Sequence, residues 1–234
     1  MFSIRLANHN FNIENKYNYV YKLCKKYYSN ERSGILISVT DDEILQEQTG
    51  GYSLDYLESL AIYRKIAEYL IDHETLLFHG SAIAVDHKAY LFTAPSGTGK
   101  STHARLWRKL FGQRAVMIND DKPFLKMTDR GVLAYGTPWD GKHHLSTNTS
   151  APLKAICILE RSEINYIEPI TQSDALPMLM QHCYRPSDPV AMKKTLSLIE
   201  RLGSSVKLYR MGCNMEPEAA QIAYNGMNER NEPK

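Results

Sequence analysis

The chain has 234 residues, of which 43% are hydrophobic and 23% charged, and its formal net charge is +2. Such proportions are ordinary for a globular protein with a sizeable core. The basic residues are scattered rather than clustered, which argues against a nucleic-acid partner. The N-terminal residues lack a signal-peptide core, and no apolar run approaches the length of a membrane span. We therefore expect a cytoplasmic protein with neither a nucleic-acid nor a membrane partner.

The cysteines are spread along the chain, at Cys24, Cys157, Cys183 and Cys213. No pair has the C-x-x-C or zinc-finger spacing, so neither a redox motif nor a structural zinc site is predicted. We expect reduced, mostly buried thiols, as is typical of cytosolic proteins.

Residues 1–50 are expected to form a small N-terminal α/β unit. The pattern predicts strands at Phe2–Leu6 and Gly34–Val39, with a helix between them at Glu14–Tyr28. The Gly50-Gly51 pair then interrupts the pattern. We place a boundary there, with residues 51–234 as the main domain, and the alternative of one compact unit stays open.

Helices and strands alternate through the main domain, which indicates an α/β fold. A helix is expected over residues 53–71, where Leu57, Leu60 and Leu70 fall on one apolar face. Expected strands are Leu76–Val85, Ala89–Thr93, Ala115–Ile118, Lys154–Leu159 and Val206–Tyr209. Further helices are expected at Ser101–Phe111, Asp174–His182, Pro189–Leu202 and Glu216–Met227, followed by a frayed polar tail at Asn228–Lys234.

The most informative motif follows the strand Ala89–Thr93 and precedes the helix from Ser101. It reads Ala94-Pro95-Ser96-Gly97-Thr98-Gly99-Lys100-Ser101-Thr102. This is close to G-x-x-x-x-G-K-[ST], with Ala94 in place of the first Gly, and such a loop points backbone N–H groups at nucleotide phosphates. In that pattern the Lys reaches the terminal phosphates and the hydroxyl of the following Ser or Thr holds Mg²⁺. The sequence therefore predicts a nucleotide triphosphate, with ATP and Mg²⁺ as the first candidates.

Two acidic residues, Asp120 and Asp121, directly follow the apolar strand Ala115–Ile118 and Asn119. In phosphate-loop enzymes a carboxylate at a strand end orders the metal ion, because Mg²⁺ prefers oxygen ligands. A second carboxylate beside it can accept a proton from an attacking hydroxyl. The alternative is a solvated turn before Pro123.

His79-Gly80 and residues 135–144 complete the candidate site. A His on a strand is more often a packed or hydrogen-bonded core residue than a catalyst, and for His79 both interpretations stay open. Residues 135–144 combine two glycines, a Pro and a Trp, which indicates a shaped loop over an acceptor site, with Lys142 as its best contact for a transferred phosphoryl group. The alternative for this loop is a structural turn with Trp139 packed on the core.

Together, His79-Gly80-Ser81, the glycine motif and Asp120-Asp121 resemble the catalytic domain of HPr kinase/phosphorylase. The stretch Ser96–Lys100 is also similar to ATP-dependent phosphoenolpyruvate carboxykinase, which shares that nucleotide-binding core. The resemblance is strong over residues 75–125 and weak elsewhere. It implies an α/β fold with a phosphate-loop core of this type in residues 51–234, next to the small α/β unit that the pattern predicts for residues 1–50.

The resemblance also implies roles for matching positions. Lys100 would neutralise the β- and γ-phosphates, with the loop from Ser96 to Thr102 (Ser96, Gly97, Thr98, Gly99, Lys100, Ser101 and Thr102) as the nucleotide-binding segment. Ser101 and one aspartate would bind Mg²⁺, while the other aspartate acts as base and His79 tunes the proton affinity of that base. The sequence does not separate the two aspartates; we favour Asp120 as base and Asp121 as metal ligand.

The preferred interpretation is an ATP-dependent kinase that transfers the γ-phosphoryl group to a hydroxyl on a peptide or protein serine, or on free serine. The adjacent acids and His79 supply proton-accepting groups that a simple nucleotide switch does not need. Two alternatives stay open: a non-catalytic nucleotide-binding regulatory module, and a phosphorylase that runs the reverse reaction. A homo-oligomer is compatible with the resemblance, since HPr kinases form hexamers.

Overall fold

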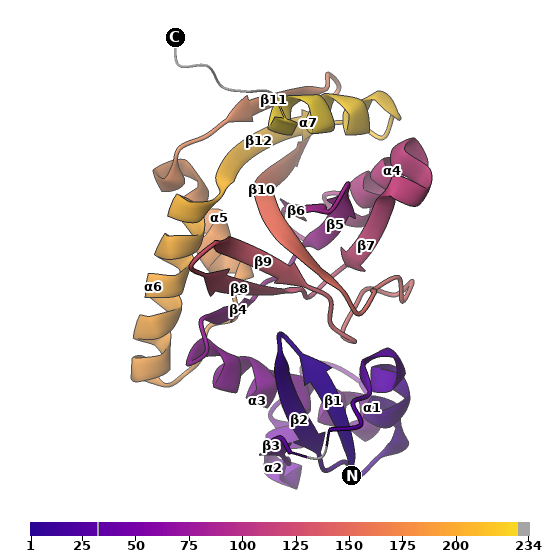
Figure 1. Ribbon diagram of the computed structural model, residues 1–234, viewed down its shortest axis with the longest axis vertical. Coiled ribbons are helices and arrows are strands. Elements are labelled where there is room, and N and C mark those ends of the chain that lie inside the picture. Colours follow the sequence, from indigo (N-terminus) through magenta and orange to yellow (C-terminus); the bar gives the residue numbers. More distant parts are fainter. Residues whose placement is uncertain (32, 229–234) are drawn as a thin grey trace.

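The computed structural model describes residues 1–31 and 33–228 (Figure 1). It is a mixed α/β protein with a curled mixed sheet and a smaller sheet near the N-terminus. The tail expected from Asn228 is only partly described: Asn228 ends the last helix, and residues 229–234 lie outside the described residues. Within the described part of the chain, no helix is both long and apolar enough to cross a membrane.

The small N-terminal sheet has the order β1-β2-β3. Its strands are β1 (Phe2–Leu6), β2 (His9–Ile13) and β3 (Ile35–Ile37), accompanied by α1 (Asn18–Leu23), a 3-10 helix (Cys24–Tyr27) and α2 (Asp41–Leu45). The helix expected over Glu14–Tyr28 is shorter, because the backbone N–H groups of Lys16 and Tyr17 donate to the buried carboxylate of Glu58 instead of starting a helix. Strand β2 was not predicted, since its hairpin turn uses Ala7 and Asn8 at positive φ rather than the usual Asn-Gly pair.

The N-terminal unit shares its core with the long helix α3 (Leu54–Ile71). One buried cluster joins Phe11 and Ile13 of the small sheet to Leu57 and Ile66 of α3 and reaches Trp139. Residues 1–50 therefore close their core against α3, on the far side of the Gly50-Gly51 boundary.

The large sheet has the order β4-β8-β9-β10-β6-β5-β7, and β12 pairs with both β10 and β11. The long strand β10 makes the sheet curl (Figure 1), because its first residues pair antiparallel with β9 and its later ones pair parallel with β6 and β12. The bounds are β4 (Thr75–Leu77), β5 (Ser81–Val85), β6 (Lys88–Thr93), β7 (Ala115–Asn119), β8 (Phe124–Thr128), β9 (Gly131–Tyr135), β10 (Ser150–Arg161), β11 (Tyr166–Pro169) and β12 (Lys207–Cys213).

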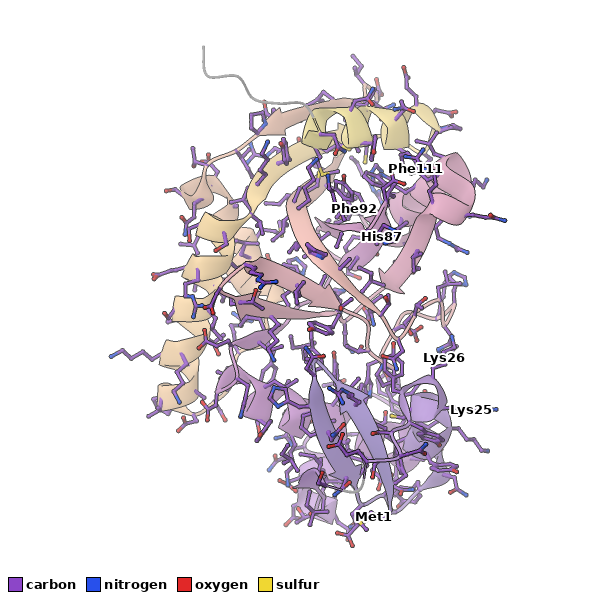
Figure 2. All side chains as sticks on the ribbon, viewed as in Figure 1. Met1, Lys25, Lys26, His87, Phe92 and Phe111 are labelled. Carbon is purple, nitrogen blue, oxygen red and sulfur yellow. The ribbon has the colours of Figure 1, made fainter. Side chains whose placement is uncertain are left out.

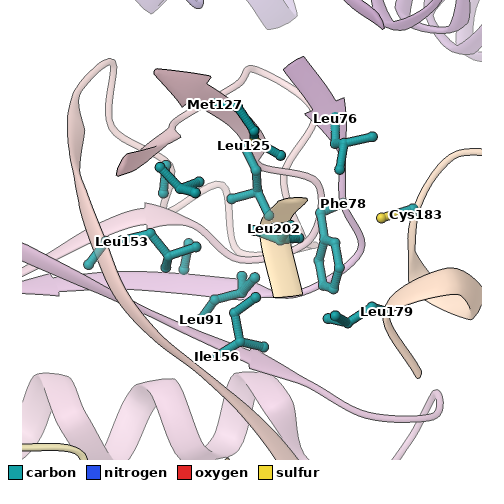
Figure 3. Packing of buried hydrophobic residues seen from close by; sticks show 14 of the residues in the cluster. Leu76, Phe78, Leu91, Leu125, Met127, Leu153, Ile156, Leu179, Cys183 and Leu202 are labelled. Atoms are coloured by element: carbon teal, nitrogen blue, oxygen red, sulfur yellow. The ribbon is translucent and has the colours of Figure 1, made fainter. Parts of the chain in front are cut away.

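Helices cover both faces of the sheet, because side chains alternate between the faces along each strand. On one face, Leu91 and Ile156 pack against α5 (Gln172–His182) and α6 (Pro189–Ser205), as the close-up in Figure 3 shows with Leu179 and Leu202. The other face packs against α4 (Lys100–Phe111) and α7 (Glu218–Asn228). Figure 2 labels Phe92 and Phe111 on this second side, where Phe92 contacts Trp107 and Phe111 contacts Tyr224.

Strand direction brings the candidate residues to one edge of the sheet. Strands β6, β10 and β12 run parallel, and β5 runs antiparallel to both β6 and β7. The carboxyl ends of β6, β7, β10 and β12 and the start of β5 therefore meet at the same edge. In open α/β sheets this is the edge at which ligands bind.

One expected strand, Leu76–Val85, is interrupted at Phe78–Gly80 and forms β4 and β5. The break arises because these amides donate to carbonyl oxygens outside the neighbouring strands: Phe78 to Pro123, His79 to His182 at the end of a helix, and Gly80 to Asp121. Each of the cysteines lies in the described part of the chain; Cys24, Cys157 and Cys183 are buried, and Cys213 is half-buried.

Candidate functional site

The glycine loop, residues 94–99, connects buried β6 to α4. Gly97 and Gly99 have φ angles of 78° and 124°, which residues with a side chain rarely adopt. Lys100 is the first residue of α4, so the backbone N–H groups of Lys100, Ser101 and Thr102 lie in the first turn, where a helix offers no acceptors of its own. The loop therefore presents amide donors and the positive end of a helix dipole at the sheet edge.

Two cationic side chains shape this loop. Lys100 folds back so that its Nζ donates to the carbonyl oxygen of Ala94 at 2.9 Å. Arg161, at the end of β10, donates from Nη2 to the carbonyl oxygen of Gly97 at 2.7 Å. Burial lowers the pKa of Lys100, while Asp121 and Asp120 oppose that shift. Lys100, at the start of α4, is therefore a half-buried ammonium group whose charge interacts with both carboxylates.

Asp120 follows β7 and is buried beside the start of α4. Its Oδ1 accepts a hydrogen bond from Ser81 Oγ at 2.6 Å. Burial raises the pKa of Asp120, and the hydroxyl groups of Ser81 and Ser101 limit this rise. Asp120 and Ser101 thus form a pair of oxygen donors of the kind that Mg²⁺ prefers.

Asp121 faces a different set of partners. His79 Nε2 lies 3.2 Å from Asp121 Oδ1, and Lys122 Nζ lies 3.7 Å from Oδ2. Burial alone would raise the pKa of Asp121, but the hydrogen bond from His79 and the charge of Lys122 hold the pKa below its ordinary value. Asp121 is therefore an ionised acceptor with one oxygen fixed by His79.

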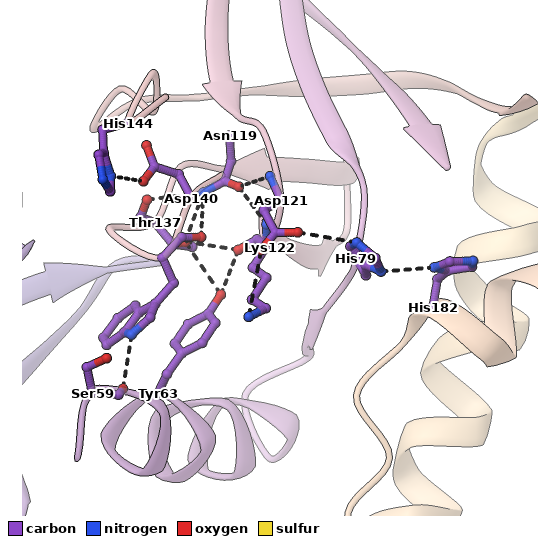
Figure 4. A network of polar contacts seen from close by, with 11 residues as sticks. Ser59, Tyr63, His79, Asn119, Asp121, Lys122, Thr137, Asp140, His144 and His182 are labelled. Atoms are coloured by element: carbon purple, nitrogen blue, oxygen red, sulfur yellow. Dashed lines mark hydrogen bonds and ion pairs between the residues drawn. The ribbon is translucent and has the colours of Figure 1, made fainter. Parts of the chain in front are cut away.

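Behind His79 lies a second imidazole, as Figure 4 shows. The Nδ1 atoms of His79 and His182 are 3.3 Å apart, and the His79 backbone N–H donates to the carbonyl oxygen of His182 at 2.7 Å. Burial, together with His79 and Lys100, lowers the pKa of His182 to about 4. His182 is thus neutral at physiological pH and can orient the ring of His79 toward Asp121. No feature of the sequence indicated His182.

Asn119 holds the aspartate pair in position. Its Oδ1 accepts from the backbone N–H groups of Asp121 at 2.8 Å and Lys122 at 2.6 Å, and its Nδ2 donates to Thr137 Oγ1 at 2.9 Å (Figure 4). The sequence signal for this role was an Asn directly after the apolar run Ala115–Ile118; in the structure Asn119 is fully buried at the end of β7. Neither Asn119 nor Thr137 was predicted.

The loop of residues 136–146 lies over Asp120. A Cβ on Gly141 would lie 3.4 Å from the Asp120 carbonyl oxygen, so the two segments are in close approach. Trp139 anchors the loop: it is 5% exposed, stacks on Tyr63 at 4.1 Å and donates from Nε1 to the Ser59 carbonyl oxygen at 3.0 Å. Trp139 is thus packed on the core, as expected if this loop were a structural turn. The rest of the loop extends over the candidate site.

Lys142 and His143 of this loop share one cavity with Ser101 and Asp120. This cavity has a volume of about 620 Å³ and is also lined by Arg105 and Arg108, so most of its charged side chains are basic. His144 points elsewhere, with Nδ1 2.9 Å from Asp140 Oδ1.

The structure therefore brings most of the predicted residues to one edge of the sheet. Asp120, Lys142, Ser101 and Thr102 line one cavity, and Lys100 and His79 lie beside the aspartates. Ser96 is exposed in the loop, and the Thr98 backbone N–H donates to the Pro95 carbonyl oxygen at 3.3 Å. One expected pairing differs: His79 contacts Asp121, not the favoured base Asp120. Among the residues that the structure describes, no group of three or more His, Cys, Asp or Glu side chains is placed so that it could hold a metal ion.

Comparisons with known proteins identify a family. None of the curated proteins compared with the chain matches it. The solved HPr(Ser) kinase/phosphatase from Coxiella burnetii has a weakly similar fold, with a TM-score of 0.37 and 9% identity over 64% of this chain and 95% of that chain. A family model described as "SynChlorMet cassette protein ScmC" matches residues 52–187, a span that contains the glycine loop, both aspartates, Lys142 and His182. The chain belongs to the ScmC family.

Proposed function

We propose that this protein is an ATP-dependent kinase that transfers the γ-phosphoryl group to the hydroxyl of a serine, in a peptide or protein or as free serine. The observation that carries the proposal is the meeting of two sets of groups at one sheet edge. Lys100 and Ser101 belong to the phosphate-binding set, and Asp121 with His79 belongs to the proton-accepting set. A protein that only sensed a nucleotide would need the first set alone.

Lys100 and the loop amides would bind the triphosphate. The ammonium group of Lys100 would leave the Ala94 carbonyl oxygen and bind the β- and γ-phosphates. A hydrogen bond between two charged groups is stronger than one to a neutral carbonyl oxygen. Lys142, in the cavity that Asp120 lines, would contact the transferred phosphoryl group from the opposite side.

The hydroxyl of Ser101 and the carboxylate of Asp120 would hold Mg²⁺, which fits these residues because both supply oxygen ligands. When bound, the ion would neutralise part of the negative charge of the phosphates. This assignment exchanges the roles that we favoured from sequence. The exchange rests on contacts: Asp120 lies beside Ser101, whereas Asp121 lies beside His79.

Asp121 would then serve as the base. His79 fixes Oδ1 of Asp121, so Oδ2, which lies 3.7 Å from Lys122 Nζ, would accept the proton of the acceptor hydroxyl. The hydroxyl oxygen forms a bond to the γ-phosphorus as the bond from that phosphorus to the β,γ-bridging oxygen breaks. ADP leaves with the bridging oxygen, and the proton resides on Asp121.

The test is phosphoryl transfer from γ-labelled ATP to L-serine and to a library of serine-containing peptides. We expect label in an acceptor with the wild-type protein and a loss of roughly a hundredfold or more with Lys100→Ala. Lys109→Ala, an exposed lysine further along α4, is the matched control and should retain activity.

Saturable Mg-ATP binding without transfer to any hydroxyl would contradict the kinase and favour a regulatory nucleotide-binding module. Phosphate-dependent removal of phosphoryl groups from a phosphoserine peptide, without forward transfer, would favour the phosphorylase.

A further inference from the structure

A second cavity lies against the glycine loop, apart from the one that holds Asp120. Its volume is about 660 Å³, within the range of small-molecule sites. It is lined by the glycine loop from Gly97 to Gly99, by Thr102 of α4 and by the segments that follow β10 and β12. Because the lining includes residues of the loop itself, any group bound there would be continuous with a ligand held by the loop amides.

The two cavities differ in chemistry. Arg105, Arg108 and Lys142 make the first one cationic, with Asp120 as its carboxylate. The second presents mainly apolar surface, including Cys213 and Met215, with Arg161 and Glu163 as its charged members. Met215 lines the second cavity and is 76% exposed, so its apolar side chain can contact a group bound there.

The wall of the second cavity is held in place by side-chain bonds between two loops. Asn165 Nδ2 donates to Asn214 Oδ1 at 3.0 Å, and the Asn214 backbone N–H donates to Asn165 Oδ1 at 2.9 Å. Asn214 Nδ2 also donates to the carbonyl oxygen of Glu163 at 3.0 Å. Together with the bond from Arg161 to Gly97, these contacts join the ends of β10 and β12 to the glycine loop. The cavity is therefore built before any ligand enters.

We propose that this second cavity is the nucleoside subsite, which receives the base and ribose of the nucleotide whose phosphates bind the glycine loop. The inference rests on the proposed function and adds to it the place of the nucleoside. A flat nucleobase would pack on Met215 and the Cys213 side, and the carboxylate of Glu163 on the rim would accept hydrogen bonds from ribose hydroxyls.

Cys213 provides a direct probe of this subsite. It is half-buried and lines the cavity, whereas Cys24, Cys157 and Cys183 are buried. In the native protein a small maleimide at mildly alkaline pH should therefore label Cys213 first, and Cys213→Ser should remove that labelling. The rate is measured alone, with Mg-ATP and with magnesium triphosphate, which carries the phosphates without a nucleoside.

At about ten times its dissociation constant, Mg-ATP should slow the labelling of Cys213 roughly tenfold, because the bound fraction is shielded. Magnesium triphosphate at matched saturation should leave the rate nearly unchanged. Equal protection by both ligands, or no protection by Mg-ATP while calorimetry shows that it binds, would overturn the subsite and leave the proposed kinase intact. No calorimetric binding of Mg-ATP would instead overturn the proposed function.

A second variant decides the matter even if Cys213 reacts slowly. Met215→Asp changes an exposed residue, so the fold should be retained, and it should weaken Mg-ATP binding roughly tenfold by removing the apolar contact. Binding of magnesium triphosphate should change little. Val190→Asp, at a 64% exposed position on α6, is the control and should change neither. Unchanged Mg-ATP affinity in Met215→Asp would overturn the subsite.

Discussion

Asp121 Oδ1 lies 3.2 Å from His79 Nε2, although Asp121 follows β7 and His79 lies between β4 and β5. His182 lies behind His79, with the two Nδ1 atoms 3.3 Å apart. When His79 donates from Nε2 to Asp121, its Nδ1 can accept a hydrogen bond from Nδ1 of His182. The other ring nitrogen of His182, Nε2, is buried and has no hydrogen-bond partner. This arrangement fixes the direction of the His79 proton toward Asp121.

Replacing His79 tests that arrangement. His79→Asn shortens the side chain and removes the hydrogen bond to Asp121, so the base loses its orientation. We expect turnover to fall roughly 10- to 100-fold, with little change in ATP affinity. His87→Asn, in the exposed turn between β5 and β6 where φ is 63°, is the matched control, since Asn tolerates that conformation. Turnover unaffected by His79→Asn would show that the contact has no part in transfer.

Replacing the aspartates one at a time separates their roles. Asp120→Asn should raise the Mg²⁺ concentration needed for half-maximal activity by roughly tenfold, because a charged metal ligand becomes neutral. Asp121→Asn should lower turnover by about a hundredfold or more with an unchanged Mg²⁺ requirement. Measured Mg²⁺ titrations of both variants check this, and the opposite pattern would restore the assignment favoured from sequence.

Stability should depend on pH through His103. Its ring is 2% exposed, and burial lowers its pKa from 6.5 to about 4. In the unfolded chain His103 therefore takes up a proton as the pH falls below 6.5. In the folded chain His103 stays neutral until the pH reaches about 4. The contribution of His103 to the free energy of unfolding is therefore fully present above pH 6.5. As the pH falls through 6.5 to about 4, this free energy decreases by on the order of 3 kcal/mol.

Urea unfolding across this pH range, for wild type and His103→Gln, checks the prediction. Glutamine keeps an acceptor for Trp107 Nε1, which donates to His103 Nε2 at 3.0 Å, but does not titrate. His103→Gln should flatten the pH dependence between the two pKa values. Identical slopes for the two proteins would contradict the assignment.

Gly136 should be intolerant of any side chain. A Cβ there would lie 2.0 Å from the Thr147 carbonyl oxygen and 2.8 Å from that of Ile118, just before the aspartate pair. Gly136→Ala should therefore lower the free energy of unfolding by about 2 kcal/mol or more. Gly51, whose Cβ would meet nothing within 4 Å, is the control, and Gly51→Ala should change stability by less than about 0.5 kcal/mol. Thermal unfolding of both variants decides, and equal stability would contradict the close approach.

The glycine loop was predictable from sequence because its information is local. A buried strand, two glycines, a Lys-Ser pair and a helix stand in one continuous run, and the structure places β6 and α4 within one residue of the expected bounds. The same holds for β7, which extends the expected strand only by Asn119.

The partner of each aspartate was not predictable, because it depends on pairing between strands. The register between β5 and β7 shifts between Ala82 and Ile83, which pair with Asn119 and Met117. A shift of one residue turns the following side chains to the other face, so it decides which aspartate meets His79. His182 lies more than a hundred residues from His79, and only the packing of α5 on the sheet brings the two together.

We propose that the glycine loop and Lys100 bind the phosphates of a magnesium nucleotide. Isothermal titration of Mg-ATP into wild type, Lys100→Ala and Lys109→Ala tests it most directly. We predict saturable binding by wild type and Lys109→Ala, and at least about tenfold weaker binding by Lys100→Ala. Absence of any uptake of Mg-ATP or Mg-GTP by the wild-type protein, or equal affinity in Lys100→Ala, would contradict the account.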